Sequence, residues 1–146
     1  DHVCFTTEIN PGSGFKPLNK IASGGELSRF LLAVKLCFLG DNNKKTQIFD
    51  EIDRGVGGAT ASAIGKRLLE LSKHEQVIVV THSPQVAAYS DNHLKVEKIN
   101  FDKSTVTKID TLNEEKTVRE IARMLSGELI TSEALAAAAT LRKASK

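Results

Sequence analysis

The alternation of apolar and polar residues divides the chain into short strands and helices. Residues 3–9 are mostly β-branched or aromatic and end at an Asn-Pro-Gly-Ser-Gly run over 10–14, which predicts a strand and then a turn. A second extended stretch is expected over residues 17–21. A helix is expected to begin at Ser23 and to run to about residue 39, where the Gly-Asp-Asn-Asn run at 40–43 ends it.

This first long helix carries apolar residues around much of its circumference. One set falls at helical spacing: Leu27, Phe30, Leu31, Val34 and Phe38. Leu32, Leu36 and Leu39 fall on other faces, so we expect the helix to be covered on more than one side. Cys37 lies in the same apolar run and is expected to be a buried free thiol.

The middle of the chain alternates strands with helices. A short strand is expected over residues 46–52, followed by a flexible Gly-rich loop over 55–58. The helix expected next, over 59–71, has three apolar residues on one face, which are Ile64, Leu68 and Leu71. Residues 77–80 are all apolar, as is typical of a strand covered on both faces in a parallel sheet.

The last third of the chain predicts a hairpin and a pair of helices. A short helix is expected over residues 85–89, and two alternating segments, 94–99 and 105–109, predict an antiparallel hairpin. Helices over about 114–125 and 132–142 follow it. The order of helices and strands indicates an α/β fold with a mostly parallel sheet flanked by helices.

The composition of the chain limits the classes of protein to which it can belong. The chain has 146 residues, which predicts one domain over 1–146, and 20 basic against 18 acidic residues give a net charge of +2. That balance excludes a disordered polyelectrolyte and gives no global argument for a nucleic-acid or membrane partner.

Two cysteines, Cys4 and Cys37, are too few for a disulfide framework or a zinc site, and by default indicate a reducing, intracellular setting. The chain begins at Asp1 without a signal-peptide pattern, and we expect a fragment of a longer protein.

The run Ser23-Gly24-Gly25-Glu26 opens the first long helix. Ser23 and Glu26 have the spacing of a capping box, in which each side chain binds the other residue's backbone amide. The box leaves two glycines in the first turn unexplained, where each costs about 1 kcal/mol. Glycine allows an anion to reach the amides at the positive end of the helix dipole, so Gly24 and Gly25 indicate a phosphate contact beside the capping interpretation.

Two adjacent carboxylates, Asp50 and Glu51, follow the apolar pair Ile48-Phe49. Sheets in α/β proteins bind ligands at the carboxyl ends of their strands. Asp50 suits Mg²⁺ binding through water, and Glu51 suits orienting or deprotonating a water molecule. The alternative is a solvated strand end whose acids precede a helix.

His82 follows the 77–80 run directly and precedes Ser83-Pro84. A histidine at a strand end can donate a hydrogen bond to a terminal phosphate, although a lone histidine is more often structural. The three signals together indicate one nucleotide pocket, because each is a strand end or a helix start and their order is the one such a pocket requires.

Three segments carry a resemblance to ABC-type ATPases. Residues 22–29 (Ala-Ser-Gly-Gly-Glu-Leu-Ser-Arg) resemble the signature motif, residues 48–51 the Walker B strand, and residues 79–83 the switch-histidine strand. The run Asp50-Glu51-Ile52-Asp53 resembles the SMC-like branch, whereas transporter domains usually have Pro after the Glu. Further segments make the chain similar, over essentially its whole length, to the RecN family of bacterial DNA repair proteins: 49–58, 81–88 and 121–127.

The resemblance implies the C-terminal lobe of a split, SMC-like ATPase head. In that family the Walker A loop lies in an N-terminal lobe, and a long coiled coil separates the two lobes. No G-x-x-x-x-G-K-[ST] run occurs in this chain, and Gly65-Lys66-Arg67 lies inside a predicted helix without the motif's first glycine or its hydroxyl residue. The cofactors implied are ATP and Mg²⁺.

The resemblance also implies roles for individual residues. Asp50 would support Mg²⁺, Glu51 would position the attacking water, and His82 would contact the γ-phosphate. Signature residues would bind the γ-phosphate of the nucleotide held by a second head: Ser23, Gly24 and Gly25, with Glu26 in the same motif. The chain departs from the pattern at Gln47, which interrupts the apolar run before Asp50, and at Gly57, where many ABC proteins have an aspartate.

The function expected is therefore half of an ATPase site in a RecN-like DNA repair protein. Its expected partners are the Walker A lobe, a second head in a homodimer and DNA, with no membrane, in the cytoplasm near the nucleoid. The fragment alone is expected to be inactive. Two alternatives stay open, a nucleotide-binding subunit of a transporter and a non-catalytic dimerisation module.

Overall fold

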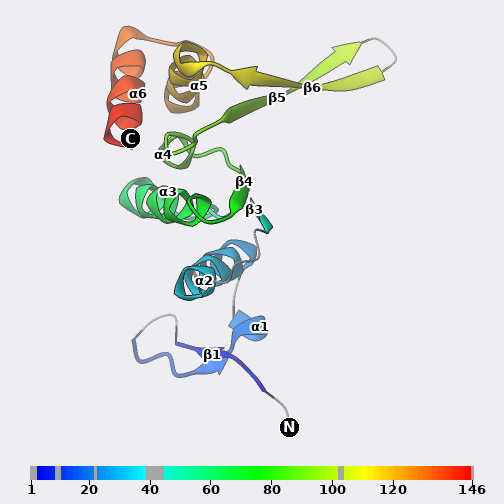
Figure 1. The fold of residues 1–146 in the computed structure, drawn as a ribbon, viewed down its shortest axis with the longest axis vertical. Coiled ribbons are helices and arrows are strands. Elements are labelled where there is room, and N and C mark those ends of the chain that lie inside the picture. The colour runs from blue at the N-terminus through cyan, green and yellow to red at the C-terminus, as the bar shows by residue number, and fades with distance from the viewer. Residues whose placement is uncertain (1–2, 9–10, 22, 39–44, 102–103, 146) are drawn as a thin grey trace.

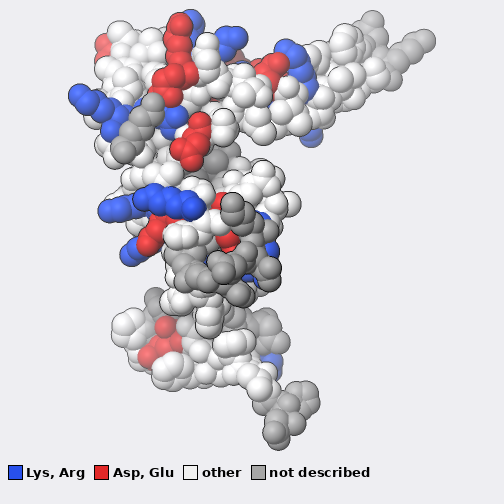
Figure 2. Space-filling model, viewed as in Figure 1, with Lys and Arg blue, Asp and Glu red and all other residues white. Residues whose placement is uncertain are grey.

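The computed structural model describes residues 3–8, 11–21, 23–38, 45–101 and 104–145. The described elements are arranged along one long axis, with β1 and α1 at one end and α5 and α6 at the other (Figure 1). On the face that Figure 2 shows, basic and acidic side chains are interspersed around the helices and the hairpin base, in keeping with the small net charge of +2.

The N-terminal segment pairs two short strands. β1 (Thr6–Thr7) is antiparallel to β2 (Lys16–Pro17), and α1 (Leu18–Ile21) follows at once. The prediction of an extended stretch over 17–21 is therefore wrong beyond Pro17. The fixed φ of proline suits the start of a helix, and the Leu18 amide donates to the Phe5 carbonyl at 2.9 Å.

Helix α2 (Gly24–Cys37) begins at the predicted cap, Ser23. Leu32 is buried and Leu36 packs against the same core, but most of the predicted apolar stripe faces outward: Leu27, Leu31 and Phe38 are exposed. The opposite side of α2 is partly covered as well, because Phe30 is partly buried and its ring centroid lies 6.3 Å from that of Phe5, while the side that carries Leu27 and Leu31 is open. Cys37 is an exposed free thiol, so the prediction that it is buried is wrong, because among the described residues none covers it at this last turn of the helix. The predicted helix end, residues 39–43, lies outside the described residues.

The central layer consists of two parallel strands and a helix. β3 (Thr46–Asp50) pairs in parallel with β4 (Gln76–Val80), with Ile48 opposite Ile78 and Asp50 opposite Val80. α3 (Gly58–Ser72) connects them and buries the predicted face. The first hydrophobic core gathers residues from α2, β3, α3 and the segments that follow β3 and β4: Leu32, Phe49, Ile52, Ala61, Ile64, Leu68, Leu71 and Val86.

The second face of β3 and β4 is uncovered. Alternate residues face the core, and those between them are exposed: Ile48 at 69%, Ile78 at 43% and Val80 at 58%. The expectation that residues 77–80 are covered on both faces is therefore wrong for this chain, although the strand itself is confirmed. Within the described ranges parallel pairing is confined to these two strands, and the other two sheets are antiparallel pairs.

The C-terminal part holds a second hydrophobic core. α4 (Pro84–Ala87) leads into β5 (His93–Phe101) and β6 (Ser104–Leu112), and α5 (Glu114–Ser126) and α6 (Ser132–Ala144) close the chain. The predicted hairpin is confirmed and projects away from the helices (Figure 1); its turn, residues 102–103, lies outside the described residues. The second core is built from small residues and one isoleucine: Ala87, Ala88, Ile121, Ala122, Ala134 and Ala138.

A buried arginine joins the last helix to the rest of this part. The Arg142 guanidinium donates to the carbonyl oxygens of Ala88 at 2.7 Å and Ser90 at 2.5 Å, and to both carboxylate oxygens of Glu114 at 3.0 Å. Among the helices in the described ranges, none has the length and apolar character required to cross a membrane.

Candidate functional site

The start of α2 forms the predicted capping box. The Ser23 amide donates to Glu26 Oε2 at 2.8 Å, and the Glu26 amide donates to Ser23 Oγ at 3.4 Å. The hydrogen bond from the Ser23 backbone is the main cause that lowers the pKa of Glu26, so this carboxyl stays ionised beside the positive end of the helix. The box accounts for Ser23 and Glu26 as local structure.

The two glycines in the first turn have different surroundings. A Cβ at Gly25 would lie 3.1 Å from the Glu51 carbonyl oxygen and 3.2 Å from that of Arg54. Gly25 is therefore required for packing against the turn after β3. A Cβ at Gly24 would meet no atom within 4 Å. Of the pair, Gly24 is the one that offers open backbone to an incoming group.

Helix α2 is bound directly to the turn that follows the β3 carboxylates. Arg29 Nη1 donates to the carbonyl oxygens of Ile52 and Arg54, both at 3.1 Å, and Ser28 Oγ donates to that of Asp50 at 3.5 Å. Sequence reasoning gave neither residue a role. The available signal was the spacing of Arg29 four residues after Gly25, which puts both on one face of the helix.

The carboxylates at the end of β3 are both exposed. Asp50 is the last residue of the strand, and Glu51 adopts a left-handed conformation with φ of 53°. That conformation costs a non-glycine residue about 1–2 kcal/mol and reverses the chain directly after the strand. Glu51 accepts a hydrogen bond from Arg54 at 2.8 Å in a solvent-exposed ion pair, which contributes little stability. Its carboxylate is therefore accessible from solvent.

A buried carboxylate joins this turn to the end of β4. Asp53 is only 2% exposed, and its Oδ2 accepts from Thr81 Oγ1 at 2.5 Å and from the Ser83 amide at 3.1 Å. His82 lies between these two donors and is itself exposed. Sequence reasoning used Asp53 only to tell families apart, because burial of its side chain depends on the pairing of β3 with β4.

These contacts therefore link the three segments that carry the predicted site residues, one to the next. The start of α2 packs on the 51–54 turn, and that turn is bound through Asp53 to the residues on either side of His82. The described residues contain no cluster of three or more His, Cys, Asp or Glu side chains that could hold a metal ion. Asp50 fits a magnesium ion only as one oxygen ligand, with phosphate and water oxygens completing the set.

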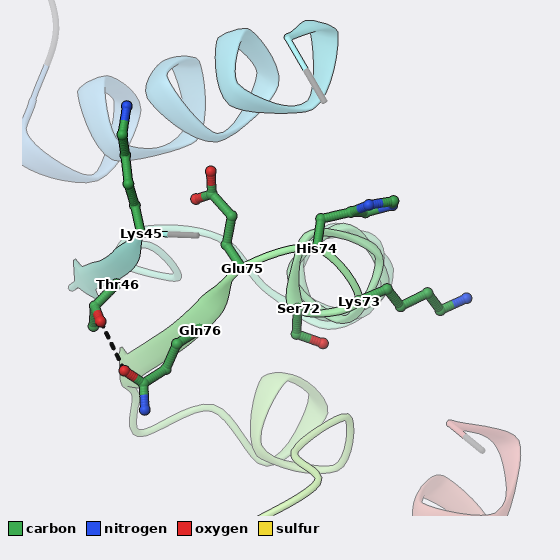
Figure 3. A pocket seen from close by; sticks show the side chains of 7 residues that line it. All are labelled: Lys45, Thr46, Ser72, Lys73, His74, Glu75 and Gln76. Atoms are coloured by element: carbon green, nitrogen blue, oxygen red, sulfur yellow. Dashed lines mark hydrogen bonds between the residues drawn. The ribbon is translucent and has the colours of Figure 1, made fainter. Parts of the chain in front are cut away.

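An open cavity of about 410 Å³ lies at the opposite end of the same strands (Figure 3). Its lining residues come from the starts of β3 and β4 and the end of α3: Lys45, Thr46, Ser72, Lys73, His74, Glu75 and Gln76. Thr46 donates to Gln76 Oε1 at 2.7 Å across the two strands. Because ligands of parallel sheets bind at the carboxyl ends of strands, this cavity is not the site that the motifs indicate.

Comparison with known proteins gives consistent matches along the chain, although no protein family model matches it. The chain is 48% identical over 141 residues to the DNA repair protein RecN of Rickettsia felis, which covers 97% of the chain and 26% of the relative. RecN of Streptomyces coelicolor is 48% identical over 128 residues, covering 88% of the chain and 22% of the relative. RecN of Xylella fastidiosa is 47% identical over 137 residues, covering 94% and 25%.

The chain therefore spans about a quarter of the length of these relatives. A solved structure from work on ATP-driven dimerization and DNA-stimulated activation of SMC ATPases has the same fold. The match has a TM-score of 0.54 at 24% sequence identity, and it covers 81% of this chain and 70% of the chain in that structure. By sequence the chain is homologous to a segment of the RecN DNA repair proteins, and it shares its α/β fold with this structure from the work on SMC ATPases.

Proposed function

We propose that this chain is one lobe of an ATPase head that acts in DNA repair. The observation that carries the proposal is the continuous set of contacts from the start of α2, through the 51–54 turn, to the residues beside His82. The RecN relatives, named as DNA repair proteins, and the SMC ATPase fold support it. The transporter alternative receives no support from these relatives.

Within the head, the residues at the strand ends act on the reacting phosphate and water. Glu51, exposed after β3, orients the attacking water and accepts its proton, and His82 donates a hydrogen bond to the γ-phosphate. Asp50 holds one position of a hydrated Mg²⁺, which when bound neutralises phosphate charge. Catalysis of this kind depends on positioning and charge stabilisation, so the turn that fixes these groups matters as much as the groups themselves.

The start of α2 serves a second nucleotide site. The dipole of the helix favours an anion at this end, and the open space at Gly24 allows close approach to the backbone. In the proposed mechanism Ser23, Gly24 and Gly25, with Glu26 holding the capping box, contact the γ-phosphate bound by a second head. ATP then holds two heads together.

The other parts of the proposed ATPase belong to the longer protein. The proposal assigns the phosphate-binding Walker A loop to an N-terminal lobe and DNA contact to the assembled protein in the cytoplasm, near the nucleoid. We expect the 146-residue chain alone to release no phosphate from ATP, because it has no Walker A loop. Phosphate release at ordinary enzyme rates that Glu51→Gln abolishes would contradict this.

The test uses the longer protein with three single variants and one double variant. Glu51→Gln keeps the side-chain shape but removes the proton acceptor, so ATP hydrolysis should fall at least 100-fold while ATP-dependent dimers accumulate. Ser23→Arg puts a long cation at the start of α2, so each head should still bind ATP but the heads should not form dimers. The double variant Glu51→Gln/Ser23→Arg should also fail to form dimers. Glu115→Gln, an exposed carboxylate on α5, is the matched control and should change neither.

Light scattering with and without ATP follows the dimers, and phosphate release follows turnover. If Glu51→Gln leaves hydrolysis unchanged, the catalytic proposal is wrong. If ATP still drives association of the Ser23→Arg variant, Ser23 is only a helix cap. Nucleotide-dependent association with no hydrolysis in the unmodified protein would instead favour a non-catalytic dimerisation module.

A further inference from the structure

Asp53, which has no predicted role at the site, makes a buried polar bridge to the residues beside His82. Asp53 Oδ2 accepts hydrogen bonds from Thr81 Oγ1 and from the Ser83 amide, while the Ser83 amide also lies 2.9 Å from Thr81 Oγ1. The two donors come from the residues immediately before and after His82. The carboxylate therefore holds the side chain of the residue before that histidine and the backbone amide of the residue after it.

Part of the Asp53 bridge lowers the free energy of unfolding. Asp53 is 2% exposed, and its second oxygen, Oδ1, is buried without a hydrogen-bond partner among the described residues. A buried polar atom left unsatisfied lowers the stability of the fold. The other oxygen, Oδ2, accepts from both donors beside His82, so the carboxylate fixes the position of residues 81–83 whatever its net contribution to stability.

The same turn carries Glu51. The Arg54 amide donates to the Glu51 carbonyl at 3.0 Å and the Val56 amide to the Asp53 carbonyl at 3.3 Å, so residues 51–56 form one compact unit. Its outward side presents the Glu51 carboxylate, and its inward side presents Asp53 to β4. A shift of this unit would move Glu51 and the backbone of His82 together.

We propose that Asp53 and Thr81 are positioning residues that set the place of His82 relative to Glu51. The inference rests on the proposed function, because it assigns His82 and Glu51 to the same reacting phosphate and water. Asp53 and Thr81 do not touch the nucleotide in this scheme. They act through the backbone of residues 81–83, so their loss should slow turnover without weakening nucleotide binding.

The test compares matched variants in the longer protein. Thr81→Val keeps the shape and removes the hydroxyl, so kcat for ATP hydrolysis should fall about 10- to 100-fold with KM changed less than twofold. Thr81→Ser restores the hydroxyl and should recover most of kcat. Thr107→Val, an exposed threonine on β6, is the control for the same chemical change and should alter neither constant.

A double-variant cycle separates positioning from general destabilisation. If Thr81 acts through His82, Thr81→Val should lower kcat no further in a His82→Ala background. Should Thr81→Val fail to fold, Asp53→Asn takes its place, with a smaller loss of kcat in the same non-additive pattern.

Additive effects, a rise in KM alone, or full activity of both Thr81→Val and Asp53→Asn would overturn the inference. Activity of Glu51→Gln, measured in the same assay, reports on the proposed function separately. If Glu51→Gln is inactive while the bridge variants are fully active, the function stands and the bridge has no positioning role.

Discussion

At the scale of single residues, Gly25 has a packing role that its neighbour lacks. Replacing Gly25 by Ala forces a methyl group against two backbone carbonyl oxygens at 3.1 and 3.2 Å, neither of which is the end of a flexible side chain. We expect Gly25→Ala to lower the free energy of unfolding by about 1–3 kcal/mol. Gly24→Ala should leave it unchanged or slightly higher. Equal effects of the two variants in thermal unfolding would contradict this assignment.

The same two variants separate packing from phosphate contact in the longer protein. Gly24 has open space, so its replacement should affect ATP-dependent association and not stability. The sequence predicted an anion contact for both glycines alike. It could not assign the packing role, since the oxygens that Gly25 meets belong to residues 51 and 54, which only the folded chain brings near.

A half-buried histidine at the start of β5, His93, makes stability depend on pH. Burial is the main cause that lowers the pKa of His93 from its ordinary 6.5; the Glu120 charge on α5 raises it, and the Arg142 charge on α6 lowers it. Because the folded value is below the unfolded one, the neutral form is favoured in the fold. Its contribution to stability is present above pH 6.5 and is lost as the pH falls below 6.5 through the folded value.

We therefore expect the denaturant midpoint of the chain to fall between pH 7 and pH 5.5 and His93→Gln to flatten that decline. His74, exposed in the turn between α3 and β4, provides the control substitution His74→Gln. An unchanged slope in the His93→Gln variant would exclude this histidine as its source.

At the scale of elements, the last helix depends on a single buried cation. Arg142 satisfies the carbonyl oxygens of Ala88 and Ser90 and pairs with Glu114, so it connects α6 to the end of α4 and the start of α5. Arg142→Met should lower the free energy of unfolding by about 3 kcal/mol, because buried oxygens lose their donor. Lys143→Met, at an exposed neighbour, should change it by less than about 0.5 kcal/mol. Similar loss in both variants would contradict this role.

The elements that the sequence predicted well are those whose signals are local. The Ser23 cap, the apolar face of residues 64–71 and the alternation in the hairpin each identify an element without reference to distant residues. Predictions of burial were less accurate. Cys37 and the 77–80 strand look internal by composition, but whether a face is covered depends on which other segments pack there, and the described residues leave these faces open.

At the scale of the whole molecule, the open face of β3 and β4 favours self-association of the chain. Ile48, Ile78 and Val80 present apolar side chains on one side of a two-stranded sheet. Exposed apolar surface of this kind favours association. We expect sedimentation of the chain to show association that increases with concentration and decreases in the Ile48→Lys variant. Thr107→Lys, at an exposed polar residue of the hairpin, provides the control. A strictly monomeric chain would argue against a missing lobe over this face.

The two hydrophobic cores meet at one short helix. Val86 of α4 packs in the first core, while Ala87 and Ala88 pack in the second. We expect each core to open without the other, so the amides on the two sides of α4 should exchange hydrogen with solvent as two cooperative groups with different opening free energies. On this expectation α4 is the hinge between the cores, and a partner bound to the hairpin or the last helices would reorient them without unfolding the strands that Glu51 and His82 follow.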